Sequence, residues 1–248
     1  MFTKEQIETL EKNYLEEIIF LLEHEKDKML QGLDTKEAIR GDWEKFWGDN
    51  TSDYAVGAER IYYWLFNQFG VPNSAPVGSD LFFERKDAYV HIDIKSVTLK
   101  NIGDTIGTIF VGDNQNSYVG NIVTKGNVSR PYQGQLPFVY SKHLGNKIIE
   151  KPCLTYFIVL LHDTDLHELN LMYVCSMPNG CLYDTYGDDV LSAGKNPGKI
   201  RYRFKNASKF LNLQGEPSRF FVLHWNDNMA TSTKKKLEFF EKIYQEQQ

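Results

Sequence analysis

Several features that would assign a function quickly are scarce or missing in this sequence of 248 residues. No apolar run approaches the roughly 20 residues that cross a bilayer. The N-terminus is polar and acidic, which is unlike a secretory signal. The three cysteines, Cys153, Cys175 and Cys181, include no CxxC pair. They therefore predict reduced thiols in a cytoplasmic protein, with no disulfide framework or zinc site. The missing apolar run predicts that the chain has no membrane span.

Two common catalytic motifs are also missing. There is no GxxxxGK[ST] loop, which argues against ATP-driven work, and no GxSxG turn, which argues against a serine hydrolase. What the chain does have is 42% hydrophobic and 14% aromatic residues, enough for a sizeable folded core. The chemistry of this folded chain must therefore come from other residues.

Charge is distributed unevenly along the chain. The net charge of -5 disfavours a nucleic-acid partner mildly, but residues 1–50 hold 13 acidic and 7 basic residues. Residues 114–151 hold five basic residues and one acidic residue, and residues 190–213 hold six basic residues and no acidic one. These two segments could present positive charge to phosphates, or they could be ordinary solvated loops, and both interpretations stay open.

Hydrophobic periodicity predicts one α/β domain over residues 1–248. Its first helix should begin after a Thr3 cap and end at Gly32, and its last should be capped by Thr231 or Ser232. Residues 98–152 show little periodicity and predict a long polar loop. The expected helices span 4–30, 36–47, 54–69, 206–213 and 231–246, and the expected strands span 80–84, 88–97, 153–162, 169–176, 199–204 and 218–224.

Three charged residues near the second strand suggest chemistry. Asp93 and Lys95 are two residues apart on one strand and therefore share a face. If the strands at 80–84 and 88–97 pair antiparallel, Asp80 lies beside Asp93, and two such carboxylates need a cation between them. Mg²⁺ suits oxygen ligands, and a lysine can orient a water or stabilise negative charge, so the group favours phosphodiester hydrolysis. A hairpin whose charges simply face water is the alternative.

This pattern resembles the PD-(D/E)xK nuclease superfamily. Asp80 matches the first acid, although Ser79 replaces the usual proline, and Asp93-Ile94-Lys95 matches the second half after a spacer of 12 residues. Glu59 matches the glutamate of the helix that precedes the motif. The resemblance covers about residues 54–97, with a further core strand at 153–162.

The resemblance implies the fold, the activity and the active-site residues. The fold would be a restriction-endonuclease-like core, with a central mixed β-sheet flanked by helices. Asp80, Asp93 and the main-chain carbonyl of Ile94 would bind one or two Mg²⁺ ions. Lys95 would activate the attacking water, and Glu59 would hold a second metal or its water shell. We therefore expect a type II restriction endonuclease that cuts double-stranded DNA at a short specific sequence. A structure-specific repair or recombination nuclease and a non-catalytic DNA-binding module are the alternatives.

The segment after the catalytic strand is rich in amides. Asparagine and glutamine can read adenine edges, and arginine can read guanine, so we expect DNA-recognition loops within residues 98–152, although a Gly/Asn-rich surface loop is an equal alternative. Tyr118 and Tyr132 are interpreted as anchors of this loop. The candidate DNA contacts are Asn114, Gln115, Asn116, Asn121, Lys125, Arg130, Gln133 and Gln135, together with Arg201 and Arg203 of the later basic segment.

Two further expectations concern assembly and histidines. A palindromic target needs two active sites, which predicts a homodimer. The N-terminal helical segment of residues 1–50 precedes a catalytic core of residues 51–248. This segment is a candidate dimer contact, unless its apolar stripe packs on its own core. His91 is interpreted as structural, because we expect it to share the face of Asp93 only if the strand is bulged. A metal site at His162, Asp163 and His167 is a minor alternative to a polar strand end.

Overall fold

The computed structural model describes residues 2–34, 66, 80–123, 128–163, 168–194, 200–204, 213 and 218–248. The helices expected at 36–47, 54–69 and 206–213 lie outside these residues, apart from Phe66 and Leu213. So do Glu59, Lys125 and His167. Within the described ranges, no helix is long and apolar enough to cross a membrane.

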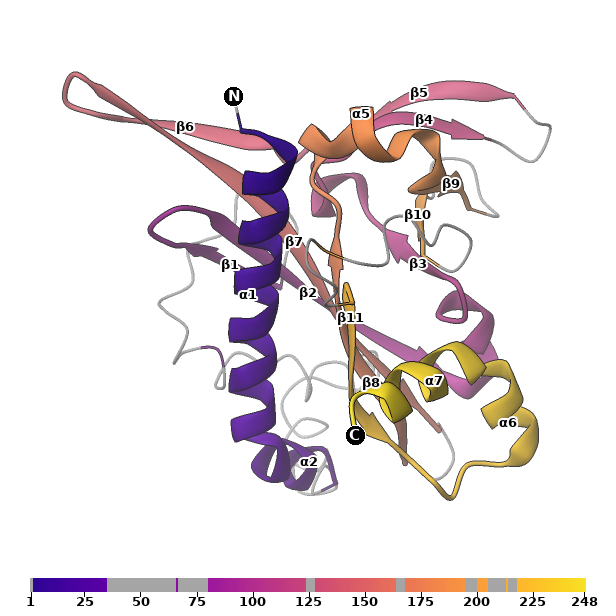
Figure 1. Ribbon diagram of the computed structural model, residues 1–248. Coiled ribbons are helices and arrows are strands. Elements are labelled where there is room, and N and C mark those ends of the chain that lie inside the picture. Colours follow the sequence, from indigo (N-terminus) through magenta and orange to yellow (C-terminus); the bar gives the residue numbers. More distant parts are fainter. Residues whose placement is uncertain are drawn as a thin grey trace, which may run out of the picture.

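The core of the molecule is a mixed β-sheet (Figure 1). Strands β2 and β7 are parallel, whereas the β1–β2, β7–β8 and β8–β11 pairs are antiparallel. The predicted α/β class with a central mixed sheet is therefore confirmed. The strands in spatial order are β1 (Leu81–Glu84), β2 (Tyr89–Thr98), β7 (Lys147–His162), β8 (Leu169–Met177) and β11 (Phe220–Trp225).

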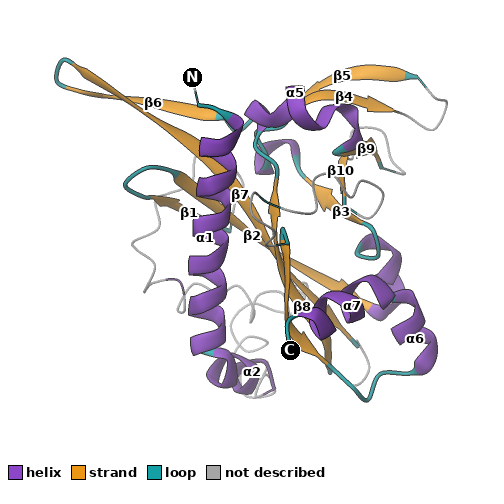
Figure 2. Cartoon of the chain, viewed as in Figure 1, coloured by secondary structure: helices purple, strands orange, loops and turns teal. Residues whose placement is uncertain are grey.

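Both faces of the sheet are covered, which explains the long apolar run in its central strand, β7. Residues 153–162 of β7 are all buried, as the sequence predicts for a central strand. One face, with Ile92 and Ile158, packs against the first helix, and the other, with Phe157 and Val159, packs against the inserted strands and the C-terminal helix. Figure 2 shows these helices on the sheet.

The N-terminal helix is shorter than predicted and is followed by a second one. Thr3 caps α1 (Lys4–His24), as expected, in a capping box with Gln6. The predicted end at Gly32 is wrong: α1 ends at Glu25, whose N–H is shared between the carbonyls of Leu21 and Glu23, and α2 (Lys26–Asp34) continues past Gly32. The apolar stripe of α1 packs on the chain's own sheet.

The C-terminal helix is also divided. It consists of α6 (Thr231–Lys236) and α7 (Glu238–Glu246), joined at the buried Leu237. The predicted cap by Thr231 or Ser232 is wrong, because Ala230 holds the cap position and no side chain bonds the first turn.

The expected loop at 98–152 is largely ordered secondary structure. Strands β4 and β5 form a hairpin, β3 pairs with β10, and β10 pairs with β9. Local periodicity misses these strands because they are short and because the partner of β3 lies far along the chain. The elements are η1 (Leu99–Asp104), β3 (Thr108–Val111), η2 (Asp113–Gln115), β4 (Val119–Val123), β5 (Ser129–Gln133), β6 (Val139–Leu144), β9 (Leu191–Ala193) and β10 (Ile200–Arg203).

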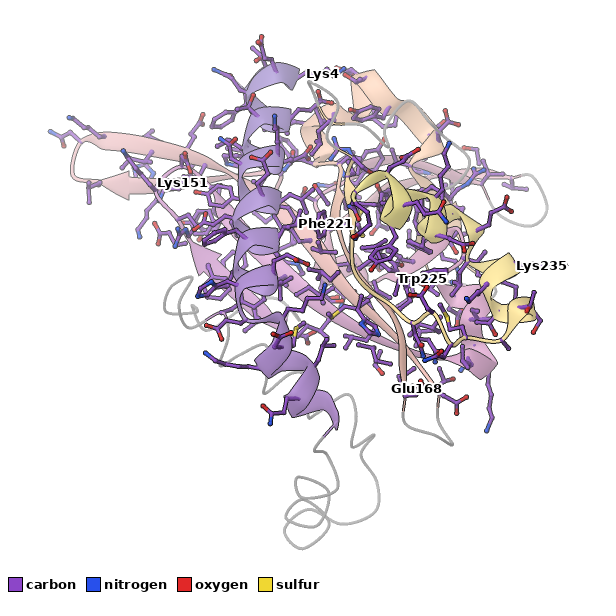
Figure 3. All side chains as sticks on the ribbon, turned by 60° about the horizontal axis from the view of Figure 1, so that its bottom comes forward. Lys4, Lys151, Glu168, Phe221, Trp225 and Lys235 are labelled. Carbon is purple, nitrogen blue, oxygen red and sulfur yellow. The ribbon has the colours of Figure 1, made fainter. Side chains whose placement is uncertain are left out.

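A long hairpin of β6 and the first part of β7 extends from the body (Figures 1 and 2). We call residues 139–151 the arm. At its foot, Lys142 and Lys151 both bond the carboxylate of Glu84 on β1, at 3.0 Å each, and Figure 3 labels Lys151 there. Leu144 and Ile148, near the tip, are 63% and 61% exposed. The arm is thus fixed at one end and carries apolar side chains in solvent at the other.

A buried ionic network holds α1 to the far end of the chain. Arg219 is fully buried, and its Nη1 lies 2.7 Å from a carboxylate oxygen of Glu11, which is also fully buried. Glu11 also accepts a hydrogen bond from the backbone of Asn179 at 2.7 Å. Glu8, one turn earlier, accepts from the hydroxyl of Tyr186, which belongs to the turn built by η3 (Gly180–Leu182), α5 (Tyr183–Tyr186) and η4 (Gly187–Asp189).

Candidate active site

The β1–β2 hairpin brings Asp80 next to β2, the strand that carries Asp93 and Lys95. Leu81 pairs with Ile92, so Asp80, one residue earlier, lies next to Asp93 in the register. Asp80 Oδ2 accepts a hydrogen bond of 2.6 Å from the backbone N–H of Ile94. The predicted pairing of the two strands is confirmed. It places the Asp80 carboxylate against the peptide group that joins Asp93 to Ile94.

Asp93 and Lys95 face the side of the sheet that is remote from the stripe of α1. Asp93 is paired in parallel with Phe157, whose ring lies 5.7 Å from Lys95 Nζ, while the ring of Phe110 lies 5.6 Å away. The two side chains form an ion pair, and they are only 3% and 17% exposed. A carboxylate and an ammonium so poorly hydrated must be satisfied by protein groups or by ligands.

Gln115 provides those protein groups. Its Nε2 donates to Asp93 Oδ1 at 2.6 Å, and its Oε1 accepts from Lys95 Nζ at 2.9 Å. The amide-rich sequence around Gln115 predicts a DNA contact and does not predict its bonds to Asp93 and Lys95. The segment lacks periodicity, and Gln115 comes 20 residues after Lys95.

Burial and charge affect the two flanking groups differently. Asp80 is exposed as a residue, yet the protein atoms around its carboxyl group raise its pKa, an effect that the Ile94 N–H and the charge of Lys95 partly offset. Because the protein offsets the desolvation of this carboxylate only in part, a bound cation would stabilise its charged form further. The carboxylate of Asp93, in contrast, is already bonded by Lys95 and Gln115.

The expectation that His91 shares the face of Asp93 only through a bulge is wrong. The register of β2 against β7 is continuous, and in a regular strand residues 91, 93 and 95 share a face. His91 is fully buried and packs near the ring of Phe82 at 6.4 Å. Its burial, with a smaller effect of Lys95, lowers its pKa to about 3, so the imidazole is neutral and the interpretation as structural is kept.

The oxygen atoms at this site fit a hard divalent cation. Asp80 accepts a hydrogen bond from the Ile94 N–H, and Asp93 lies opposite Asp80 in the strand register, so two carboxylates are available to an ion. Among the described residues, no group of three or more His, Cys, Asp or Glu side chains could hold a metal by itself. A metal here must therefore take few protein ligands and keep waters, as Mg²⁺ does. The minor alternative at His162 is not supported within the described ranges, since its Nε2 pairs with Ser96 at 3.0 Å.

The described candidate DNA contacts, apart from Gln115, fall into three groups. In the first group, protein groups already bind the side chain: Asn116 is 1% exposed and its amide bonds Gly112 and Tyr132, while Arg201 pairs with Asp104 at 2.6 Å. Asn114, Asn121 and Arg203 are partly exposed. The exposed candidates, which lie on or just after β5, are Arg130, Gln133 and Gln135. Tyr118 and Tyr132 are buried, as expected of anchors.

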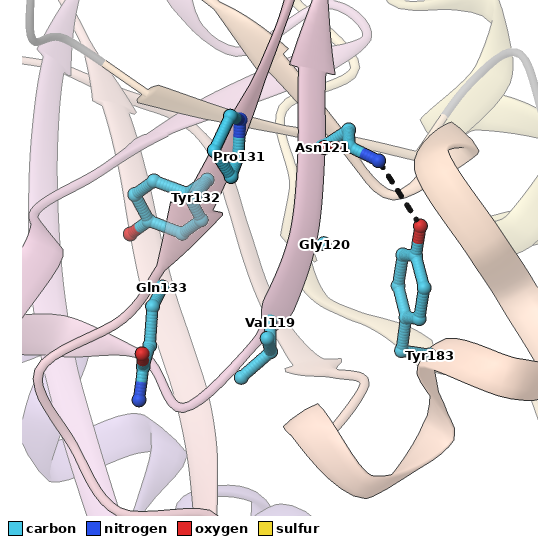
Figure 4. A pocket seen from close by; sticks show the side chains of 7 residues that line it. All are labelled: Val119, Gly120, Asn121, Pro131, Tyr132, Gln133 and Tyr183. Atoms are coloured by element: carbon cyan, nitrogen blue, oxygen red, sulfur yellow. Dashed lines mark hydrogen bonds between the residues drawn. The ribbon is translucent and has the colours of Figure 1, made fainter.

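A pocket of about 410 Å³ opens between the β4–β5 hairpin and Tyr183 of α5 (Figure 4). Its lining includes Gln133 and Asn121, whose Nδ2 lies 3.4 Å from the hydroxyl of Tyr183. The hairpin therefore presents both polar side chains and a recess.

The mixed sheet, with its hairpin and flanking helices, is the fold of the restriction-endonuclease-like nucleases. Residues 3–166 match the family model described as "Type II restriction enzyme MwoI, N-terminal domain", and residues 169–225 match that of its central domain. The chain belongs to this MwoI family of type II restriction enzymes. It is accordingly a site-specific deoxyribonuclease, and the predicted class of enzyme is confirmed.

Two solved structures are similar. A chain of the tetrameric restriction endonuclease SfiI, solved with cognate DNA, matches with a TM-score of 0.63 at 16% identity, over 92% of this chain and 88% of that chain. The restriction endonuclease BglI, bound to its DNA recognition sequence, matches with a TM-score of 0.47 at 15% identity, over 81% of this chain and 94% of that chain. The likeness to SfiI supports the fold. No curated protein matches the sequence.

Proposed function

We propose that this enzyme hydrolyses phosphodiester bonds of double-stranded DNA at a short specific sequence with Mg²⁺, through Asp80, Asp93 and Lys95. The observation that carries the proposal is the geometry around Ile94: Asp80 bonds its N–H, and Asp93 lies one residue before it. The two carboxylates and the Ile94 carbonyl would hold the ion. Restriction endonucleases depend generally on divalent metals, and this oxygen set suits Mg²⁺.

Each residue has a distinct task in this proposal. When bound, the metal supplies Lewis acidity and lowers the pKa of a water. Asp93 holds the ammonium of Lys95 at the end of the site, and Lys95 orients the attacking water and stabilises the developing negative charge. Cleavage would leave 5′-phosphate and 3′-hydroxyl ends. Glu59, outside the described residues, is proposed to hold a second ion or its water shell.

The enzyme would read its target with the insert that follows the catalytic strand. Arg130, Gln133 and Gln135 are exposed side chains of the types that bond base edges and phosphates. They belong to the β4–β5 hairpin and the turn after it, and a two-stranded ribbon fits the major groove.

We also propose that two copies act together, since a palindromic target presents two equivalent cleavage points. We place this contact at the arm. Its tip carries the exposed Leu144 and Ile148 beside Lys147, while the exposed face of α1 carries Phe20, 72% exposed, between Glu16 and Glu23. An apolar, basic tip and an apolar, acidic helix face are complementary, so the arm of one copy would dock on α1 of the other.

The decisive experiment compares the wild type with Lys95→Ala on phage DNA, with Mg²⁺ and with EDTA. We expect discrete fragments from the wild type with Mg²⁺ only, and a loss of at least about 100-fold in rate in the variant. Retention of DNA binding by the variant in EDTA would show that it folds. Lys242→Ala is the matched control, because this side chain is 77% exposed on α7.

Three outcomes would contradict the proposal. Full activity of Lys95→Ala would remove the lysine from the mechanism. Cleavage of branched DNA only would favour a structure-specific nuclease, and no cleavage with any divalent ion would favour a binding module.

A further inference from the structure

The catalytic pair is held by a side chain that comes from outside the catalytic hairpin. Gln115 donates from Nε2 to Asp93, and its Oε1 accepts from both Lys95 Nζ and, at 2.8 Å, the backbone N–H of Gly112. One amide thus bonds the carboxylate and the ammonium at the same time. Hydrogen bonds to charged groups are stronger than hydrogen bonds between neutral groups.

A primary amide is the side chain that fits this position. It has a donor end for the carboxylate and an acceptor end for the ammonium, and it adds no charge of its own. A glutamate would keep the acceptor for Lys95 but would face Asp93 with a second negative charge. An alanine would leave Asp93 and Lys95 with each other alone, in a site where they are only 3% and 17% exposed.

The backbone around Gln115 is tied to the β4–β5 hairpin. Gln135 N donates to the carbonyl of Asp113 at 2.7 Å, and Leu136 N donates to that of Asn116 at 3.2 Å. The buried Asn116 amide bonds Tyr132 of β5 at 2.8 Å. Gly134 packs directly against the backbone of Asn116, since a Cβ added at Gly134 would lie 2.2 Å from the Asn116 carbonyl oxygen. Residues 113–116 and residues 132–136 are therefore joined by several direct contacts.

We propose that Gln115 is a positioning residue for cleavage, which fixes Asp93 and Lys95 relative to each other and links them to the β4–β5 hairpin. This inference rests on the proposed roles of Asp93 and Lys95. It makes the hairpin more than a reader of bases, because any shift of the hairpin on DNA is carried through residues 113–116 to the catalytic pair. A site with the wrong sequence would seat the hairpin differently and leave the pair misaligned, so Gln115 contributes to specificity through rate.

The test is Gln115→Ala, compared with the wild type in single-turnover cleavage, in DNA binding in EDTA, and in thermal unfolding. We expect the maximal cleavage rate to fall about 10- to 100-fold, with DNA affinity in EDTA within about twofold and with the unfolding transition preserved. Gln115→Glu, of nearly equal size, should also be slow, because its carboxylate cannot donate to Asp93.

Gln245→Ala is the matched control, a glutamine that is exposed on α7, outside the proposed catalytic and DNA-reading residues. It should leave both the DNA affinity and the rate at saturating enzyme near those of the wild type. A wild-type rate for Gln115→Ala, or a rate loss matched by lost affinity or lost folding, would overturn the inference. If Lys95→Ala is inactive while Gln115→Ala is fully active, only this inference fails; if Lys95→Ala is active, the proposed function itself fails.

Discussion

Asp80 combines a structural bond with a proposed chemical role, and the two can be separated. Its Oδ2 accepts from Ile94 N at 2.6 Å, and an asparagine at this position can accept the same bond without the negative charge. We therefore expect Asp80→Asn to fold normally, with stability within about 0.5 kcal/mol of the wild type. The same variant should lose Mg²⁺-dependent cleavage.

Thermal unfolding and plasmid cleavage measure the two properties independently. Asp227→Asn, at an exposed position far along the chain, is the control for a lost surface carboxylate. A fully active Asp80→Asn would show that the charge at residue 80 is not needed.

At the residue scale, the sequence predicts the local part of the site and misses the distant part. Asp80, Asp93 and Lys95 belong to one hairpin, whose register follows from alternating apolar residues and a short turn. Gln115 reaches the same site through η2, whose position depends on bonds to residues 132–136. No local pattern encodes such contacts, so the amide-rich segment predicts a DNA contact at Gln115 and gives no sign of its bonds to Asp93 and Lys95.

At the scale of elements, the buried ionic network gives α1 its place. Removing Arg219 would leave the fully buried carboxylate of Glu11 without its cation and would leave Glu8 paired with Lys4. Breaking a buried pair in this way typically costs about 3–5 kcal/mol, and we expect this loss from Arg219→Met in urea unfolding.

The double variant Arg219→Met/Glu11→Leu separates the charge effect from packing. It should regain a large part of the loss, because replacing both partners leaves fewer uncompensated charges. If Arg219→Met unfolds at the same urea concentration as the wild type, the network contributes nothing to stability.

The same scale shows which elements are predictable. Apolar runs that are buried on both faces predict β7 and β8, and apolar residues that alternate with polar ones predict β2. Thr3 marks the start of α1. Strands β3, β4, β5 and β9 have three to five residues each and mixed polarity, so their existence depends on partners elsewhere in the chain. The helix breaks at Glu25 and Leu237 have no proline or glycine to mark them.

At the scale of the whole molecule, the arm exposes apolar side chains that a second copy could cover. Replacing Leu144 and Ile148 by aspartate should prevent the proposed dimer, because it places two charges at the apolar tip that we propose to dock on α1. Sedimentation velocity over a range of protein concentrations measures this change. Val128→Asp is the control for a charge added at an exposed apolar position outside the arm.

A change in the arm should leave the fold of each copy intact, since the substituted side chains are exposed. If the double aspartate variant and the wild type sediment alike at every concentration, the arm is not the contact between copies.

The bond between Glu11 and Asn179 joins residues 168 positions apart, and the partner of the Glu11 carboxylate, Arg219, comes later still. On the ribosome, the first helix is therefore made long before the groups that neutralise its buried acids. Until Arg219 has been made, α1 can dock only by burying a carboxylate without this cation. The order of synthesis thus favours late docking of α1 on the sheet that carries the proposed cutting residues.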